Sequence, residues 1–278
     1  MALTDETTSG SPPRFLPRGE GRLAFEVHGE GHLVVCVPGM GDLRRVYRFL
    51  AADLVTAGYR VAVMDLRGHG DSDASFSHYD DVSTGQDILA LITHLGGPAS
   101  VIGNSMGAGS AVWAAAENPD LVERLVLIGP FVRNVPTPPW QRVLLRLALR
   151  RPWGRWVWRT YFPKFYPGRT PPGFERHLAA IDASLRRRRH WAAFVRTTRT
   201  THAPAEARLG EVTAPTLVVM GTNDPDFPDP ATEAALIAAR LHGQVLLVPG
   251  AGHYPQAENA PLVSPAVVNF LTAGRTGA

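Results

Sequence analysis

The feature that most constrains the fold is an alternation of short apolar runs with helical patterns. The runs YRVAVMDL and ASVIGN are nearly continuous in apolar residues, as strands buried on both faces of a parallel sheet require. Helical spacings occur in LRRVYRFLAADLVTAG and DVSTGQDILALITHLGG, and both end at glycine. The alternation resumes after residue 208 with APTLVVMGTND and QVLLVPGAGH. It predicts an α/β protein with a parallel sheet between helical layers.

The segment 131–208 interrupts this alternation and contains no convincing strand. One of its helices is expected to begin with Thr137 as the N-cap and Pro138 in the first turn. We therefore expect residues 15–130 and 209–278 to form the α/β core and 131–208 to form an inserted helical cap, or lid. Residues 1–14 are rich in Ser, Thr, Gly and Pro and are expected to be disordered.

Charge is distributed unevenly along the chain. The segment 131–208 has sixteen arginines and one lysine against three acidic residues, although the net charge of the whole protein is only +3. Three interpretations remain open: a solvated basic face, attraction of an acidic substrate or an acyl carrier, and attachment to an anionic membrane. The basic amphipathic stretch RVLLRLALRRPWGRWVW suggests the last of these. Nucleic acid is not an expected partner, because no nucleic-acid-binding module accompanies the charge.

The single cysteine and the N-terminal sequence bear on location. Cys36 lies in the strand pattern HLVVCVPG and is expected to be an inert, buried thiol. The N-terminus lacks a charged segment followed by an apolar run, and no stretch of about 18 apolar residues occurs. A cytoplasmic protein is therefore the expectation.

The motif Gly103-Asn104-Ser105-Met106-Gly107 is the strongest indication of chemistry. It follows a predicted strand and opens a predicted helix, which is the context of the G-x-S-x-G nucleophile elbow. The residues two before and two after the serine must be small, because the strand and the helix approach each other closely there. The N-terminus of the helix favours developing negative charge. Ser105 is therefore the candidate nucleophile.

A serine hydroxyl needs a base and an orienting acid. His253 follows the last predicted strand in GAGHYP, and Asp224 follows the preceding one in GTNDPDFPD. The order Ser105, Asp224, His253 is the order that this elbow requires. Asp226 remains the competing acid, and Asp229 is expected to cap the next helix.

Other polar residues receive structural predictions. His69, in LRGHGDS, is expected to be structural rather than catalytic. Asp65 and Arg67 are expected to form buried hydrogen bonds or an ion pair, with Asp42 as a further partner. The remaining histidines belong to no motif and are expected at the surface.

These motifs, together with VPGMGD and MDLRGHGDSD, resemble those of the α/β-hydrolase superfamily over nearly the whole chain from about residue 20. The resemblance implies a three-layer α/β/α sandwich with a mostly parallel eight-stranded sheet, and a cap at 131–208 between the sixth and seventh strands. It also implies an oxyanion hole formed by the backbone amides of Met40 and Met106. A serine at the elbow, rather than an aspartate, argues against the family's haloalkane dehalogenases and epoxide hydrolases.

The function that follows is that of a serine hydrolase without metal or other cofactor, acting on a carboxylic ester of a mainly apolar small molecule through an acyl-enzyme. Thioester hydrolysis and carbon–carbon bond hydrolysis are alternatives. The elbow GNSMG resembles that of hydrolases of ring-cleavage products, but GHYPQ lacks the tryptophan that those enzymes often have after the histidine. A ligand-binding protein that retains the triad with little turnover is the alternative of another class.

Overall fold

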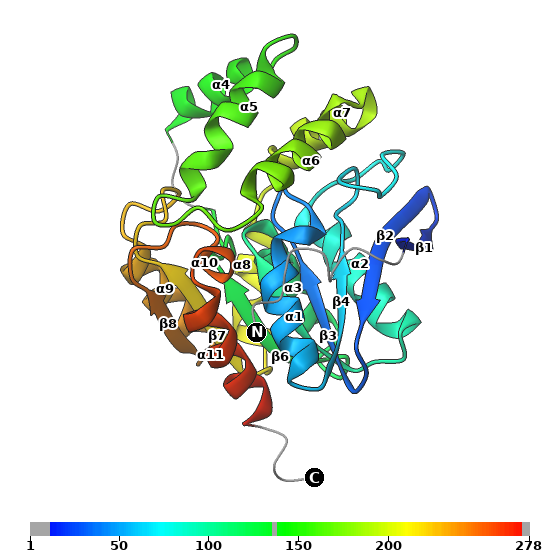
Figure 1. The fold of residues 1–278 in the computed structure, drawn as a ribbon, viewed down its shortest axis with the longest axis vertical. Coiled ribbons are helices and arrows are strands. Elements are labelled where there is room, and N and C mark those ends of the chain that lie inside the picture. The colour runs from blue at the N-terminus through cyan, green and yellow to red at the C-terminus, as the bar shows by residue number, and fades with distance from the viewer. Residues whose placement is uncertain (1–11, 135–137, 274–278) are drawn as a thin grey trace.

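The computed structural model describes residues 12–134 and 138–273 and forms one eight-stranded sheet between helical layers (Figure 1). The order across the sheet is β1-β2-β4-β3-β5-β6-β7-β8; β1 pairs antiparallel with β2 and β2 with β4, and all other pairs are parallel. The strands are β1 Arg14–Arg18, β2 Gly21–His28, β3 His32–Val37, β4 Tyr59–Met64, β5 Ala99–Asn104, β6 Val122–Ile128, β7 Thr216–Gly221 and β8 Gln244–Val248. The α/β sandwich with a mostly parallel sheet is thus confirmed.

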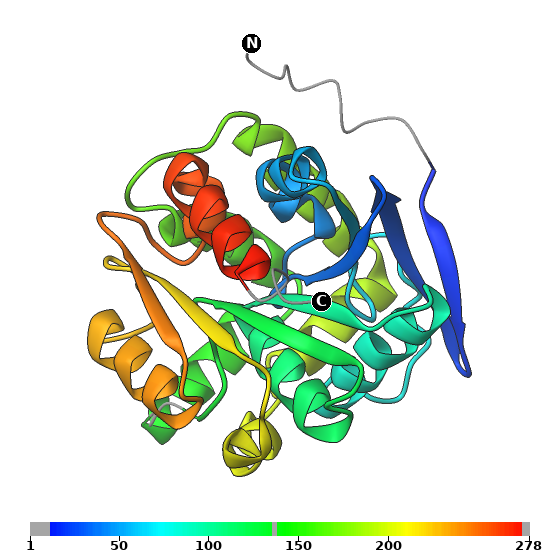
Figure 2. The ribbon, with the colours of Figure 1, turned by 90° about the horizontal axis from the view of Figure 1, so that it is seen from below.

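Helices cover both faces of the sheet, as the view in Figure 2 shows. One face carries α1 and α11, and the other carries α2, α3 and α9. Strand β3 divides its side chains between the two apolar cores in strict alternation: Val35 packs on one side and Val34 and Cys36 on the other. The helices are α1 Arg48–Thr56, α2 Asp81–His94, α3 Met106–Glu117, α9 Pro230–Arg240, α10 Pro255–Glu258 and α11 Ala260–Thr272, with a 3-10 turn η1 at Arg44–Tyr47.

Between β6 and β7 the chain forms helices only, within the residues that the structure describes. These are α4 Pro139–Ala148, α5 Gly154–Tyr161, η2 Phe162–Phe165, α6 Phe174–Arg186, α7 Arg188–Thr197, α8 Ala203–Ala207 and η3 Leu209–Glu211. Helices α4 to α7, which we call the cap helices, lie together at one end of the molecule (Figure 1). Helix α8 instead packs against α2 and α3 of the sandwich.

The start of the chain departs from expectation. Strand β1 begins at Arg14, so the end of the segment predicted to be disordered is ordered, while residues 1–11 lie outside the described residues. The predicted N-cap Thr137 also lies outside them, and Pro138 precedes α4 as its N-cap rather than lying in its first turn. Cys36 is fully buried, as predicted, and burial raises the pKa of its thiol. None of the helices in the described chain reaches the length and hydropathy needed to cross a bilayer.

Candidate active site

Ser105 stands between β5 and α3 with strained backbone angles, φ 55° and ψ −123°. Positive φ is costly for a residue with a side chain, and the surrounding packing has to impose it. A Cβ atom added at Gly103 would lie 2.4 Å from the carbonyl oxygen of Gly107, and one added at Gly107 would lie 2.5 Å from that of Val37. The need for small residues on both sides of the serine is therefore met.

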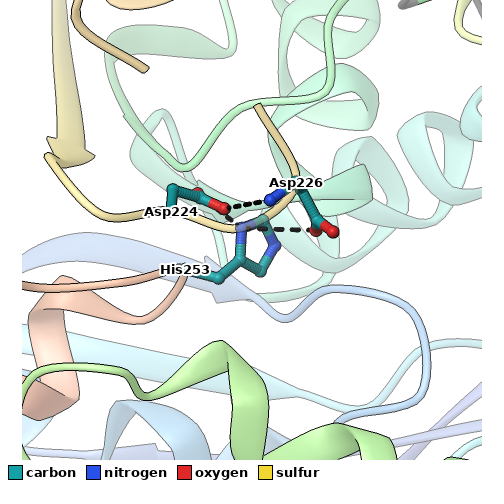
Figure 3. Close-up of side chains that lie close together, drawn as sticks. All are labelled: Asp224, Asp226 and His253. Carbon is teal, nitrogen blue, oxygen red and sulfur yellow. Dashed lines mark hydrogen bonds and ion pairs between the residues drawn. The ribbon is translucent and has the colours of Figure 1, made fainter. Parts of the chain in front are cut away.

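The Nδ1 atom of His253 lies 2.7 Å from Oδ2 of Asp224, and both side chains are buried (Figure 3). Asp226 is a more distant partner, with its Oδ2 atom 3.7 Å from the same nitrogen. The backbone amide of Asp226 donates to Oδ1 of Asp224 at 3.0 Å, which fixes the Asp224 carboxylate. Asp229 accepts a hydrogen bond from the amide of Thr232 and caps α9, as predicted.

Burial and the neighbouring carboxylates change the pKa of His253 in opposite directions. Burial alone would lower the pKa of His253, but the charge and hydrogen bond of Asp224, together with the charges of Asp226 and Asp42, raise it to about 9. The pKa of Asp226 is raised by its own burial. The imidazolium of His253 is thus strongly stabilised in the resting protein, which is the charge state that a general base acquires during catalysis.

Two polar side chains that sequence reasoning missed hold the His253 loop. The Nδ2 atom of Asn104 donates to the carbonyl oxygens of Ile128 and His253, at 3.0 and 3.2 Å. Glu258 accepts from the amide of Gly252 at 2.6 Å. Asn104 stands beside the predicted nucleophile in the sequence, but nothing in the pattern indicates its contacts.

The loop after β3 approaches Ser105 closely. A Cβ atom at Gly39 would lie 2.7 Å from the Cβ of Ser105. His69 holds the peptide between Met40 and Gly41, because its Nε2 atom accepts a hydrogen bond from the amide of Gly41 at 3.0 Å. Its Nδ1 atom donates to the carbonyl oxygen of Arg67 at 2.9 Å. Burial lowers the pKa of His69 to about 4, so the ring stays neutral and can accept this bond. The structural role predicted for His69 therefore has a physical basis: the ring positions the Met40–Gly41 segment.

Asp65 and Arg67 both form hydrogen bonds and ion pairs, as predicted, but their ion-pair partners are Arg44 and Asp87 rather than each other or Asp42. Asp65 pairs with Arg44, whose amide also donates to its carboxylate at 2.8 Å. Arg67 instead binds Asp87 on α2 through two hydrogen bonds of 2.5 and 2.8 Å. The two side chains leave the turn after β4 in different directions, and each meets an opposite charge from another element.

The prediction that the remaining histidines lie at the surface is wrong for three of them, His177, His190 and His202, which are buried. Their partners are Asp42, at 2.6 Å, the carbonyl oxygen of Ser72, at 3.1 Å, and Asp81, at 2.7 Å, respectively. Each partner stands more than 100 positions earlier in the chain, so no local pattern indicates these contacts.

Ser105 and His253 line one cavity of about 440 Å³. Met40 and Asp226 also line it, whereas Asp224 does not face it directly. The rest of the wall is mainly apolar and comes largely from the cap helices and η2: Leu144, Leu145, Leu149, Val157, Trp158 and Phe165. None of the described lining residues is a lysine or an arginine. A mainly apolar wall with a few polar groups is typical of a small-molecule site.

Asp224, Asp226 and His253 also form a group that could in principle hold a metal ion, because one ligand atom of each lies within 4.8 Å of the others. A proton shared between His253 and Asp224 accounts for their 2.7 Å separation without an ion. The residues thus fit a hydrogen-bonded pair of base and acid.

The sheet order and the strand–serine–helix elbow define the class as the α/β-hydrolase fold. Residues 30–260 match the family described as serine aminopeptidase, S33, and the chain belongs to this family of hydrolases. Of the predicted site residues, Ser105, His253 and Met40 line the cavity, Asp224 is bonded to His253, and Met106 begins α3 directly after Ser105.

Similar proteins cover nearly the full chain. A 2-hydroxy-6-oxononadienedioate/2-hydroxy-6-oxononatrienedioate hydrolase of Dechloromonas aromatica (strain RCB) is 30% identical over 98% of this chain and 100% of its own. A 2-(acetamidomethylene)succinate hydrolase of Mesorhizobium japonicum is 29% identical over 91% of this chain and 93% of its own. The crystal structure of a hydrolase from Pseudomonas aeruginosa PA01 is 25% identical, with a TM-score of 0.79, and covers 96% of this chain and 98% of that one.

Proposed function

We propose that this hydrolase cleaves carboxylic esters of small, mainly apolar molecules through an acyl-enzyme. The observation that supports this proposal is the cavity, where Ser105 and His253 meet an apolar wall without a described lysine or arginine. The placement of the serine on a strained elbow and of the histidine against a buried carboxylate supports covalent catalysis.

In the proposed reaction, Oγ of Ser105 attacks the ester carbonyl while Nε2 of His253 takes the hydroxyl proton. Asp224 orients the ring and stabilises the imidazolium. The amides of Met40 and Met106 bind the tetrahedral oxyanion, each worth about 3–4 kcal/mol in the transition state. His253 returns the proton to the departing alcohol, and a water molecule then releases the acid by the same steps.

Carbon–carbon bond hydrolysis is the second candidate, and the relatives favour it. The names of several specify a 6-oxo-dienedioate, in which hydrolysis next to the ketone breaks a carbon–carbon bond. Such a substrate brings two carboxylates, and a buried carboxylate without a partner costs several kcal/mol. Apart from His253, whose ring is already paired with Asp224, the described cavity lining offers them Asp226 but no lysine or arginine. The cavity therefore favours a neutral substrate.

The test compares p-nitrophenyl esters of increasing acyl length with 2-hydroxy-6-oxo-6-phenylhexa-2,4-dienoate, a monocarboxylate named for a relative from Comamonas testosteroni. We expect ester turnover that rises with acyl length until the cavity is filled. Ser105→Ala should abolish it, whereas Ser110→Ala, which removes another buried hydroxyl from α3, should not. Faster turnover of the dienoate than of every ester would favour the second candidate.

A protein that neither turns over any of these compounds nor reacts with a fluorophosphonate at Ser105 would contradict both candidates. The remaining interpretation would then be a ligand-binding protein that has kept the triad.

A further inference from the structure

The exposed apolar side chains of this protein are concentrated on α4 and α5. Eight of the thirteen large apolar side chains exposed in the described residues lie between positions 140 and 161. Trp140 and Trp156 are the most exposed, at 63% and 68% of their surface. The eight, which we call the apolar cap face, are Trp140, Val143, Leu144, Leu145, Leu147, Trp153, Trp156 and Tyr161.

The face is organised rather than scattered. Trp140, Val143, Leu144 and Leu147 are spaced to fall on one side of α4, so that the helix presents an apolar stripe to the outside. The indole of Trp153 donates to the carbonyl oxygen of Leu147 at 3.0 Å and ties the start of α5 to the end of α4. The two helices form the end of the molecule opposite α11 (Figure 1).

The charge around the apolar cap face is mainly positive, although Asp182 of α6 pairs with Arg155 and Arg159. The sequence contains no aspartate or glutamate from residue 124 to residue 174. The sequence has six arginines in α4, in α5 and between them: Arg142, Arg146, Arg150, Arg151, Arg155 and Arg159. Apolar and indole side chains bordered by arginines match the boundary of an anionic bilayer, where the rings enter the headgroup region and the guanidinium groups meet lipid phosphates.

We propose that the apolar cap face docks the protein on an anionic membrane surface. The charge distinguishes this partner from a second copy of the chain, because a symmetric contact through this face would bring two arginine-rich surfaces together. An apolar stripe of this extent costs solubility unless something covers it, and a lipid surface covers both the stripe and its charges.

The apolar cap face adjoins the cavity, so docking would bring the cavity to the membrane surface. Leu144, Leu145 and Tyr161 belong both to the exposed face and to the cavity lining. An apolar substrate dissolved in the membrane therefore meets the cavity entrance without crossing water. This last step rests on the proposed esterase function, whereas the docking itself does not.

The test is sedimentation with lipid vesicles, which needs no substrate. We expect the protein to sediment with phosphatidylcholine vesicles containing phosphatidylglycerol, to stay in solution with phosphatidylcholine alone, and to be released by salt. Trp140→Gln/Trp156→Gln should weaken binding roughly tenfold or more. Arg146→Gln/Arg150→Gln should weaken it roughly fivefold for each arginine.

Matched controls lie on α9, where Leu236 is an exposed leucine and Arg240 an exposed arginine. Leu236→Gln and Arg240→Gln should leave vesicle binding unchanged. The substituted residues lie outside the described cavity lining, so all variants should hydrolyse a soluble short-chain ester as the wild type does. Ser105→Ala should bind vesicles normally, which separates a failure of docking from a failure of the proposed reaction.

Three results would overturn the proposal. One is no sedimentation with anionic vesicles at low salt. Another is equal loss of binding in the α9 controls, which would indicate attraction by net charge alone. The third is a concentration-dependent dimer in sedimentation velocity that Trp140→Gln/Trp156→Gln abolishes, which would make the face a contact between copies of the chain.

Discussion

The Nε2 atom of His177 lies 2.6 Å from Oδ1 of Asp42, and this contact joins helix α6 to the loop that follows β3. Both side chains are buried, and the same Asp42 oxygen accepts from the amide of Leu43 at 2.7 Å. Asp42 stands two residues after Met40, whose amide we propose as an oxyanion donor. A cap helix is therefore bonded to the segment that supplies this part of the proposed site.

His177→Ala should destabilise the protein by about 3–5 kcal/mol, because it leaves the Asp42 carboxylate buried without its partner. The measurement is the free energy of unfolding in urea. His78→Ala is the matched control, since that ring is exposed and should cost less than about 1 kcal/mol. Equal losses in the two variants would show that the pair does not hold the cap.

Asp224→Asn should lower kcat by about four orders of magnitude, because an amide cannot stabilise the imidazolium and favours the wrong tautomer. Asp226→Asn should retain kcat within about tenfold, since its carboxylate is 1 Å farther from His253. Asparagine has nearly the same shape as aspartate, so each variant differs from the wild type mainly by the loss of one negative charge. Comparing kcat of the two variants on a p-nitrophenyl ester therefore shows which carboxylate serves as the acid. The reverse order would assign the acid to Asp226.

The rate should depend on pH through His253, whose pKa lies at about 9 in the free protein. The base must be neutral to take the serine proton, so kcat/KM should rise about tenfold per pH unit up to that pKa and level off above it. Asp226→Asn should lower the midpoint slightly, because it removes one negative charge that raises the pKa. Measuring kcat/KM between about pH 6 and 10 tests this. A midpoint near the ordinary histidine value, about 6.5, would show that Asp224 does not govern the ring.

The sequence predicts what depends on local pattern. The runs that form β3, β4, β5, β7 and β8 are recognised because each is mostly apolar. The elbow is recognised because a strand, a small-residue turn and a helix occur in one short segment. The sequence pattern does not predict β1, because its five residues, RFLPR, show no apolar alternation and only Leu16 among them is buried. The strand pairs with β2 at the edge of the sheet.

Long-range charge pairing is what the sequence does not reveal. Asp65 and Arg67 stand two positions apart in one motif, yet each pairs with a residue at least 20 positions away. His177 and Asp42 are separated by 135 positions. The packing of helices and strands decides which charged side chains meet. The sequence around a charged residue therefore does not indicate its distant partner.

The contact between His69 and the amide of Gly41 predicts that His69 positions the Met40–Gly41 segment for catalysis. His69→Ala should lower kcat up to about a hundredfold with a smaller change in KM, because the freed Met40–Gly41 segment loses a preorganised amide that acts mainly on the transition state. His69→Gln places an acceptor oxygen near the position of Nε2 and should recover part of the rate. His190→Ala is the control, because it also removes a buried neighbouring ring, but one that bonds to the carbonyl oxygen of Ser72 rather than to the amide of Gly41. Steady-state kinetics of the three variants on one ester decide the matter: if His69→Ala and His190→Ala reduce kcat equally, His69 acts only through general stability.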